Sequence, residues 1–506
     1  MVVIDYPSLV DDPDAYRAIA EGWSATGTMG RLSEDGHAAP TAYRPPIYPW
    51  LLSWLVKVDG LWLPGVAALH ILLGSLTCVL TFDLTRRLSS RFIPSDATTP
   101  EANTTHDAVF GPVRRQPLFL ALRKWRKLPA CDESVTASWR LTPLFNPDNA
   151  VVPWLAGFAV ALDPILVRQS SLIMTETSAA FLSILIWWVW VVTLHNSGRA
   201  SPFWFALIGV LLGISCLLRP STLAWCALLL VALSVRAWRL PKSKQPCNFS
   251  FFNVIFLVVG IVSVLSPWAI RNRIEFGSTI WTTTHGGYTL LLANNPVLFR
   301  HLDDEGISRK WDEDRFHERW SMRSQRDPTE VAFWSDKLDV DDATTDRVHN
   351  RFDEIADDRL ANQVAWQTII QSPWTFAKAC FARILWLWAL WPFQEIASLI
   401  LTILIGAWYL VVFSFFAFGC GYGFWKWSSA RYSAKAELEW LPAVTLIIGL
   451  TAVHFVYWSN MRMRGPMMPM IVMIAVIGIS KIPFRRSVSY TKRSVVKSDA
   501  SIIERR

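Results

Sequence analysis

Long apolar runs constrain this chain more than any other feature of its sequence. A helix needs about 20 apolar residues to cross the hydrocarbon core of a bilayer. Nine runs come close to that length, at 61–84, 151–168, 174–194, 203–218, 221–237, 251–270, 396–420, 441–458 and 465–482. A further run at 379–393, "ACFARILWLWALWPF", fits either a tenth span or a Trp-rich interfacial helix. The predicted fold class is an all-α polytopic membrane protein with a bundle of about nine or ten transmembrane helices.

The composition agrees with a membrane protein. Of the 506 residues, 52% are hydrophobic and only 18% are charged, whereas soluble proteins carry about 25% charged residues. The 28 tryptophans suit a membrane–water interface. The net charge of +8 does not predict a nucleic-acid partner, because the position of the charges matters more than their sum. The seven cysteines contain no C-x-x-C pair, so they predict neither a disulfide framework nor a metal site.

The basic clusters predict how the chain is oriented. They follow the first, fifth and seventh runs, as "TRRLSSR", "RAWRLPKSK" and "KWSSARYSAK", and they recur in the C-terminal tail. If the nine spans alternate, all four clusters lie on one side, which is then the cytoplasm. This divides the chain into an extracytoplasmic segment 1–60, a transmembrane bundle 61–270 with a cytoplasmic insertion 86–150, an extracytoplasmic segment 271–380, transmembrane helices 381–482 and a cytoplasmic basic tail 483–506.

The predicted extracytoplasmic side gathers charges of both signs beside Pro and Gly. It carries "DDPDAY", "YRPPIYP", "SSLIMTE", "LLRPS", "PWAIRNRIEFG", "THGGYTLLLANNP" and "RMRGPMMP". Charged groups near membrane depth usually face an internal cavity rather than lipid. Carboxylates beside several arginines suit a substrate that carries a phosphate and a polar group.

These motifs, in this order over residues 12–469, resemble the bacterial branch of the GT-C glycosyltransferases, which are relatives of protein O-mannosyltransferases and of lipid A aminoarabinose transferase. The N-terminal matches are Asp12, Tyr16, Ala20, Gly22, the element from Arg44 to Pro49, and Glu176. The later matches are Arg219-Pro220, Arg271-Asn272, "GGYTLLLANNP" with Asn294 and Asn295, and "RMRGPMMP" with Arg462 and Arg464.

The chain departs from the family pattern in two places. The family begins with a helix that runs from the cytoplasm to the outside, and no such helix precedes "DDPDAY" here. We therefore expect the coding region to extend upstream through an apolar span of about 20 residues. The second departure is the insertion of roughly 60 residues after "TRRL", at a point where the family has a short loop.

The resemblance implies a donor sugar on a polyprenyl phosphate and an acid that acts on the acceptor. A phosphate monoester has a second pKa of about 6, so the departing lipid phosphate needs no proton. One base then suffices, where glycosidases use two carboxylates, and the anomeric carbon is inverted. The expected base is Asp12, with Asp14 as the neighbouring catalytic candidate. The implied substrate-binding residues are Tyr16, Arg44, Glu176, Arg219, Arg271, Asn272, Asn294, Asn295, Arg462 and Arg464, the arginines holding phosphate through paired N–H groups.

Each candidate also has a purely structural interpretation. Asp12, Asp14 and Glu176 are suited to cap helix N-termini. The arginines are suited to anchor span ends at the interface, and the asparagines to form turns. Asp163 lies inside a predicted span and is interpreted as structural, with Arg168 near enough in sequence to neutralise it. His285 has no visible ligand partner, so we predict no metal site, and the sequence gives no support to a divalent metal cofactor.

The sequence thus predicts a glycosyltransferase of the cell (inner) membrane. Its acceptor is a hydroxyl of a lipid, a polysaccharide or a protein, and its other partner is the lipid bilayer. The alternative is a transporter or flippase of a lipid-linked glycan, which would favour inverted repeats that we do not see. A third alternative is a pseudoenzyme scaffold, if the upstream helix is truly lacking.

Overall fold

The structure is a computed structural model that describes residues 12, 14–57, 62–89, 151–195, 201–239, 249–307, 311, 313–335, 353–392, 398–429 and 433–481. Most of the predicted insertion 86–150 and all of the basic tail 483–506 lie outside the described residues. Within the described residues, regular structure is helical apart from one antiparallel hairpin, in which Gly30 pairs with Pro40.

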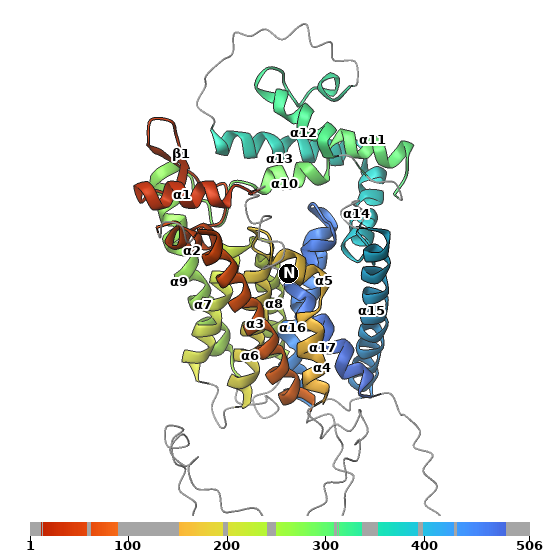
Figure 1. Ribbon diagram of the computed structural model, residues 1–506. Coiled ribbons are helices and arrows are strands. Elements are labelled where there is room, and N and C mark those ends of the chain that lie inside the picture. The colour runs from red at the N-terminus through yellow and green to blue at the C-terminus, as the bar shows by residue number, and fades with distance from the viewer. Residues whose placement is uncertain are drawn as a thin grey trace, which may run out of the picture.

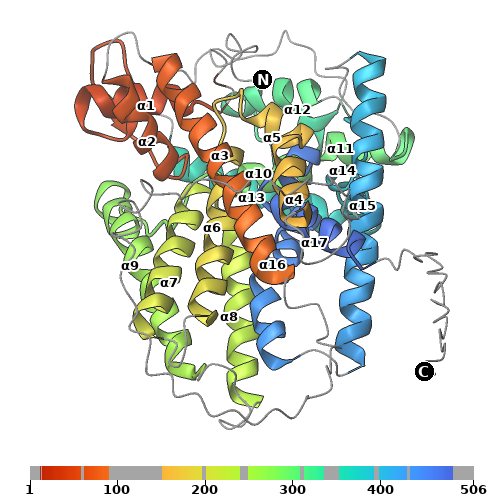
Figure 2. The ribbon, with the colours of Figure 1, turned by 60° about the horizontal axis from the view of Figure 1, so that its bottom comes forward.

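A bundle of long helices forms the body of the molecule. It comprises α3 (Trp62–Ser89), α4 (Val151–Ala161), α5 (Pro164–Gln169), α6 (Glu176–His195), α7 (Pro202–Leu218), α8 (Thr222–Arg239), α9 (Phe251–Phe276), α15 (Leu399–Ser428), α16 (Ala434–Val456), η8 (Met461–Met467) and α17 (Met468–Ile479). Figures 1 and 2 show α7 and α9 on one flank of this bundle and α15 on the other.

Shorter elements cover one end of the bundle (Figure 1). They are α1 (Tyr16–Thr26), β1 (Gly30–Leu32), β2 (Ala38–Pro40), α2 (Ile47–Val56), α10 (Gly286–Ala293), α11 (Pro296–Asp304), α12 (Glu313–Ser321), η5 (Met322–Ser324), η6 (Val331–Trp334), α13 (Glu354–Gln371) and α14 (Pro373–Leu387). We call this the site end of the bundle.

In the described part of the chain, seven helices are long and apolar enough to cross a membrane, namely α3, α6, α8, α9, α15, α16 and the continuous stretch Met461–Ile479. The predicted class, an all-α polytopic membrane protein, is therefore confirmed. The remaining two predicted spans are shorter: α7 has 17 residues, and the run 151–168 is divided into α4 and α5. The ambiguous run 379–393 falls mainly in α14, which has 15 residues and is not among the seven.

Asp163 explains why the second predicted span is divided. Its backbone is extended, and its carboxylate accepts hydrogen bonds from the amides of Ile165 and Leu166, both at 3.1 Å. Pro164 occupies the first helical position, where a missing N–H costs nothing. Asp163 therefore caps a new helix, α5, instead of continuing α4.

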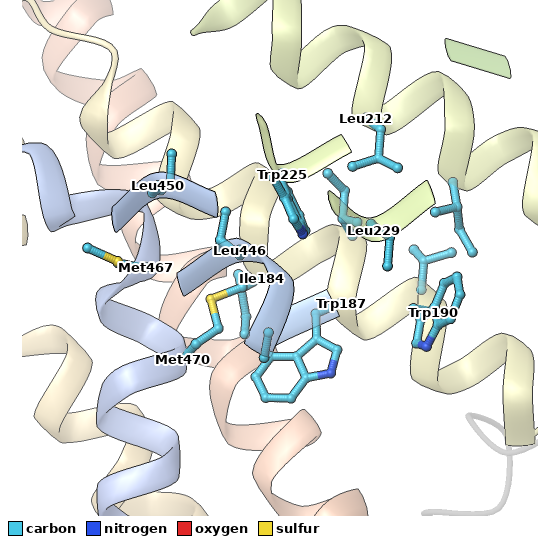
Figure 3. Packing of buried hydrophobic residues seen from close by; sticks show 14 of the residues in the cluster. Ile184, Trp187, Trp190, Leu212, Trp225, Leu229, Leu446, Leu450, Met467 and Met470 are labelled. Atoms are coloured by element: carbon cyan, nitrogen blue, oxygen red, sulfur yellow. The ribbon is translucent and has the colours of Figure 1, made fainter. Parts of the chain in front are cut away.

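Buried tryptophans link helices to one another in the core of the bundle (Figure 3). The indole N–H of Trp190 in α6 donates to the carbonyl of Leu438 in α16 at 2.7 Å. That carbonyl lacks its helical donor, because residue 442, four positions on, is Pro442. Trp225 of α8 donates in turn to the carbonyl of Pro442 at 3.0 Å. The three helices are thus held together by polar bonds as well as by packing.

Ion pairs mark the two ends of the bundle. At the site end, Glu176 at the start of α6 meets Arg219 after α7 and Arg462 before α17. At the opposite end, Arg236 of α8 pairs with Glu437 of α16 at 2.8 Å. These contacts agree with the alternation of spans from which the orientation was predicted, and the direction in the membrane stays a prediction.

Candidate active site

Asp12 stands directly before the first helix of the site end. One carboxylate oxygen, Oδ2, accepts a hydrogen bond from the amide of Ala18 in the first turn of α1, at 3.1 Å. The other oxygen, Oδ1, is buried and has no hydrogen-bond partner among the described residues. Buried polar atoms are normally paired, so an unpaired carboxylate oxygen is available to a ligand. Asp12 thus binds the first turn of α1 with one oxygen, although the N-cap position itself is Ala15, and its other oxygen has no partner among the described residues.

Asp14 is held in an ion pair. Arg44 donates from Nη2 to the Asp14 carboxylate at 2.8 Å and from Nε to the Asp14 carbonyl at 3.0 Å. The guanidinium of Arg44 also lies over the rings of Tyr16 and Tyr43, at 5.5 and 4.9 Å from their centroids. Burial lowers the pKa of Arg44, whereas Tyr16 and Asp14 raise it, and the net change is upward. Arg44 therefore stays charged, and its pairing occupies the Asp14 carboxylate.

Tyr16 lies at the centre of the predicted site residues. Its ring packs edge-on against Tyr48 at 5.1 Å, and the Tyr48 hydroxyl hydrogen-bonds His70 of α3 at 2.9 Å. Burial raises the pKa of Tyr16 to about 12, with further electrostatic effects from Arg44, Asp14, Glu176 and Arg219. The phenol is therefore neutral at any working pH. Tyr16 also shares a buried cluster with Ile173 and Leu218, which precede Glu176 and Arg219 by three residues and one residue, so the Asp14–Arg44 pair and the Glu176 ion pairs lie on one side of the molecule.

Glu176 connects two of the predicted arginines. Its Oε1 lies 3.2 Å from Arg219 Nη1 and 3.5 Å from Arg462 Nε. The carboxylate is almost fully buried, and its Oε2 has no hydrogen-bond partner in the described structure. One negative charge faces two positive charges, and the Arg462 side chain is 31% exposed. The cluster therefore keeps an excess positive charge that can attract an anion.

Arg271 lines a separate cavity of about 480 Å³. The cavity lies where α1 and α2 meet α7 and α9, and its walls include Trp23, Met29, Ile47, Leu217 and Trp268. The Arg271 guanidinium lies over the Trp268 ring, with the centroid 5.1 Å away. Besides these apolar walls, the cavity is lined by Arg271 and by the exposed carboxylate of Glu275. It therefore offers an apolar surface and a cation to an amphiphile with an anionic head group, with one carboxylate beside the cation.

The segment Thr41–Arg44 joins this cavity to the N-terminal acids. The Thr41 carbonyl accepts a hydrogen bond from Arg271 Nη1 at 3.0 Å. Three residues later, Arg44 donates to Asp14. A displacement of this short segment would therefore disturb the hydrogen bond to Arg271 at the cavity and the ion pair between Arg44 and Asp14 at the same time.

The predicted asparagines make structural contacts. Asn272 donates to the Ile280 carbonyl at 2.9 Å and accepts from Arg271 at 2.9 Å. Asn294 donates to the carbonyls of Leu290 and Val456. Asn295 caps α11, because its side chain accepts from the Leu298 amide at 2.8 Å. Asn294 and Asn295 lie at the turn between α10 and α11, whereas the capping role of Asn295 was not predicted.

Arg464 is directed away from the Glu176 cluster. Its Nη1 donates to the carbonyls of Leu387 and Ala389, at 2.8 and 2.6 Å, and its guanidinium lies 4.1 Å from the Tyr409 ring centroid. Four of the arginines implied to bind phosphate are thus divided among three places. The structure joins Arg219 and Arg462 at Glu176, places Arg271 on its own cavity, and puts Arg464 between η8 and the end of α14.

Several residues near the site were missed by the sequence analysis. His285 packs against the rings of Tyr43 and Tyr288, and burial, together with Arg44, holds the pKa of this imidazole well below its usual range. Glu354 and Asp358 of α13 bind backbone groups of the site end. The sequence offered one signal for this pair, which is their spacing of four residues, because residues four apart lie on the same face of a helix. Among the described residues, no group of three or more His, Cys, Asp or Glu side chains is placed to hold a metal ion.

Comparison with known proteins gives the following results. No family model matches the chain. No curated protein sequence matches it either. The chain is similar to two solved structures of ArnT from Cupriavidus metallidurans, one bound to undecaprenyl phosphate and one in the apo state. Identity is 12% and 11%, the TM-scores are 0.37 and 0.33, and each alignment covers 95% of this chain and 75% of ArnT. ArnT is the lipid A aminoarabinose transferase, one of the proteins that the sequence motifs resemble.

Proposed function

We propose that this protein is an inverting glycosyltransferase of the cell (inner) membrane. It takes a monosaccharide from a polyprenyl-phosphate donor and transfers it to an acceptor hydroxyl at the extracytoplasmic face. The acceptor is a lipid, a polysaccharide or a protein. The proposal rests on two features of the site end. Asp12 has a carboxylate oxygen without a partner among the described residues, and Arg271 lines a cavity with apolar walls that suits an amphiphile.

The observation that carries the proposal is the link between these two groups. Arg271, at the cavity, donates to the Thr41 carbonyl, and Arg44 of the same segment holds Asp14 two residues from Asp12. A donor whose phosphate sits on Arg271 would place its sugar toward the N-terminal acids. The apolar walls beside Arg271 would receive the first part of the lipid chain.

The proposed reaction needs one base and one anion site. Asp12 takes the proton from the acceptor hydroxyl, whose oxygen attacks the anomeric carbon from the face opposite the lipid phosphate. The bond between the anomeric carbon and the phosphate oxygen breaks, and the phosphate keeps the electron pair. Arg271 stabilises the departing phosphate, and Arg219 and Arg462 add positive potential nearby.

A panel of donors tests the proposal. Purified protein in nanodiscs is incubated with radiolabelled monosaccharides on undecaprenyl phosphate and with an extract of membrane lipids and glycans as acceptor. We expect one donor to be consumed with formation of a labelled product. Movement of the labelled lipid between leaflets without any product would instead support the flippase alternative.

Asp12→Asn separates the base from the helix cap, because Asn can still accept the Ala18 amide. We expect transfer to slow by about 10²–10⁴-fold, the usual effect of removing a general base. Binding of undecaprenyl phosphate should be unchanged. Asp14→Asn is the matched comparison: normal transfer by Asp12→Asn together with loss of transfer by Asp14→Asn would move the base to Asp14. Normal transfer by both variants would refute a carboxylate base in this segment.

A further inference from the structure

Glu354, at the start of α13, binds the segment Thr41–Arg44 from a distant part of the chain. Its Oε1 accepts the Ala42 amide at 2.7 Å, and its Oε2 accepts the Thr41 hydroxyl at 2.6 Å. Both carboxylate oxygens are therefore engaged by two consecutive residues. Hydrogen bonds to a charged acceptor are the stronger kind, so this contact fixes the segment firmly.

Asp358 makes the equivalent contact one helical turn later. Its Oδ1 accepts the Gly287 amide at 2.6 Å. Residues four apart lie on the same helix face, so one face of α13 holds both Thr41–Ala42 and the start of α10. A Cβ on Gly287 would lie 2.0 Å from the Asp358 carbonyl oxygen, so only glycine allows α10 to approach this closely.

The segment that Glu354 holds makes contacts to three other parts of the site end. The Thr41 carbonyl accepts from Arg271, the Ala42 carbonyl accepts from the Thr284 amide at 2.9 Å, and Arg44 pairs with Asp14. The position of the Arg271 guanidinium therefore depends on where the Thr41 carbonyl is placed. Glu354 is not a further base, since neither of its oxygens is free.

We propose that Glu354 is a positioning residue, which fixes the segment Thr41–Arg44 so that Arg271 presents to a lipid phosphate the N–H groups that it does not donate to the oxygens of Thr41, Asn272 and Met29. This inference rests on the proposed function for its substrate class. It adds that the affinity for the donor lipid depends on a helix that lies more than 300 residues further along the chain.

Glu354→Gln is the variant that tests this role. The amide group of Gln replaces one acceptor by a donor, so either the Ala42 amide or the Thr41 hydroxyl loses its acceptor. The matched control is Asp353→Asn, which removes the same charge one residue earlier. Asp353 caps α13 by accepting the amides of Ile355 and Ala356, and Asn can make the same cap.

Two measurements are made on each full-length variant in nanodiscs. Hydrogen exchange of a peptide covering 38–48 reports whether the segment is held. Titration with undecaprenyl phosphate reports whether Arg271 is placed for binding. For Glu354→Gln we expect faster exchange in this peptide and about tenfold weaker affinity, the effect of losing one hydrogen bond to a charged group. Asp353→Asn should match the parent in both, and all three proteins should unfold cooperatively.

Substitutions at Thr41 test the same contact from the other side. Thr41→Val keeps the shape but removes the hydroxyl, which donates to Glu354 and also accepts the Tyr43 amide at 3.0 Å within the same segment, and it should weaken undecaprenyl phosphate binding in the same direction. Thr41→Ser keeps the hydroxyl and should restore the affinity of the parent. A general loss of packing would not follow this order, so the pair distinguishes positioning from mere structural support. The pair also keeps the test decisive if Glu354→Gln fails to fold.

The outcomes separate this inference from the proposed function. Unchanged affinity in Glu354→Gln and Thr41→Val overturns the positioning role, even if the parent transfers sugar. Weakened affinity in both, with a parent that transfers no sugar from any donor, keeps the positioning role and overturns the transferase. A parent that binds no undecaprenyl phosphate overturns both.

Discussion

At the scale of single residues, the site end uses carboxylates in four ways. One oxygen of Asp12 has no partner among the described residues, and Asp14 forms an ion pair with a single arginine. Both oxygens of Glu354 accept hydrogen bonds, one from a backbone amide and one from a hydroxyl. Glu176 is a fourth case, because its Oε1 serves two arginines while its Oε2 has no hydrogen-bond partner in the described structure. The sequence presents all four as acids, and only their neighbours distinguish them.

Glu176 should matter more for stability than either of its partners alone. Removing it leaves two guanidinium groups facing each other without a counter-charge, and breaking a buried ion pair costs about 3–5 kcal/mol. We therefore expect Glu176→Ala to lower the free energy of unfolding by that amount. Arg462→Ala should cost less, because its side chain is 31% exposed and the site can admit water. Denaturant unfolding in detergent measures both, with the exposed Glu275 as an alanine control, and equal costs for the first two variants would contradict this interpretation.

Asp358 predicts a pH dependence of stability. Burial raises the pKa of its carboxyl to about 6 in the folded protein, above the ordinary value of 3.8. Between these two pH values the folded state binds more protons than the unfolded state, so the contribution of Asp358 to stability falls as the pH rises. Asp358→Asn still accepts the Gly287 amide and does not titrate.

The measurement compares melting temperatures of the parent and Asp358→Asn from pH 4 to pH 7. The parent should lose stability relative to the variant as the pH rises through this range. A difference that is constant with pH, or that changes in the opposite direction, would show that Asp358 does not titrate in this way.

At the scale of helices, close packing in the bundle depends on glycine. A Cβ on Gly260 of α9 would lie 2.2 Å from the Ala206 carbonyl oxygen of α7, and a Cβ on Gly209 of α7 would lie 2.1 Å from the Leu257 carbonyl oxygen. The two backbones therefore touch, as in other membrane helices that pack through small residues. The cavity of Arg271 lies at the end of this same helix pair, so its shape depends on their separation.

Two glycine-to-alanine variants should have opposite effects. Gly260→Ala forces α7 and α9 apart and should cost about 1–3 kcal/mol, the range for an overpacked core. Gly74→Ala in α3 meets nothing within 4 Å, and it should be neutral or stabilising by up to about 1 kcal/mol, because alanine favours the helix. Denaturant unfolding compares the two variants with the parent. Equal effects would mean that the contact between α7 and α9 is not tight in solution.

At the scale of the whole molecule, the spans alternate and the site elements gather at one end (Figure 1). The described members of the basic clusters, at the ends of α3, α8 and α15, lie at the opposite end, which predicts that the site end is extracytoplasmic. A cysteine placed at exposed Asp304 in α11 should react with a membrane-impermeant maleimide on intact cells. A cysteine at Ser429, after α15, should react only after lysis. The parent chain corrects for its native cysteines, and the reverse pattern would invert the orientation.

The sequence by itself determined the features that depend on neighbouring residues. The seven long apolar helices follow from the apolar runs, and a helix that begins a few residues after Asp12 follows from the acids before it, although its N-cap is Ala15. The orientation, inferred from the basic clusters, stays a prediction. The division of the run 151–168 was missed because Asp163-Pro164 was interpreted by its charge and not as a helix start.

Tertiary structure alone decided which charges meet. Glu354 binds Thr41 across a separation of 313 residues, and no local pattern specifies such a contact. Arg462 and Arg464 stand two positions apart and reach different partners, Glu176 and the end of α14. They lie on η8, a 3₁₀ helix, whose three residues per turn rotate each successive side chain by about 120°. The physical reason is that a buried charge needs a partner of fixed geometry, and packing between distant segments supplies it.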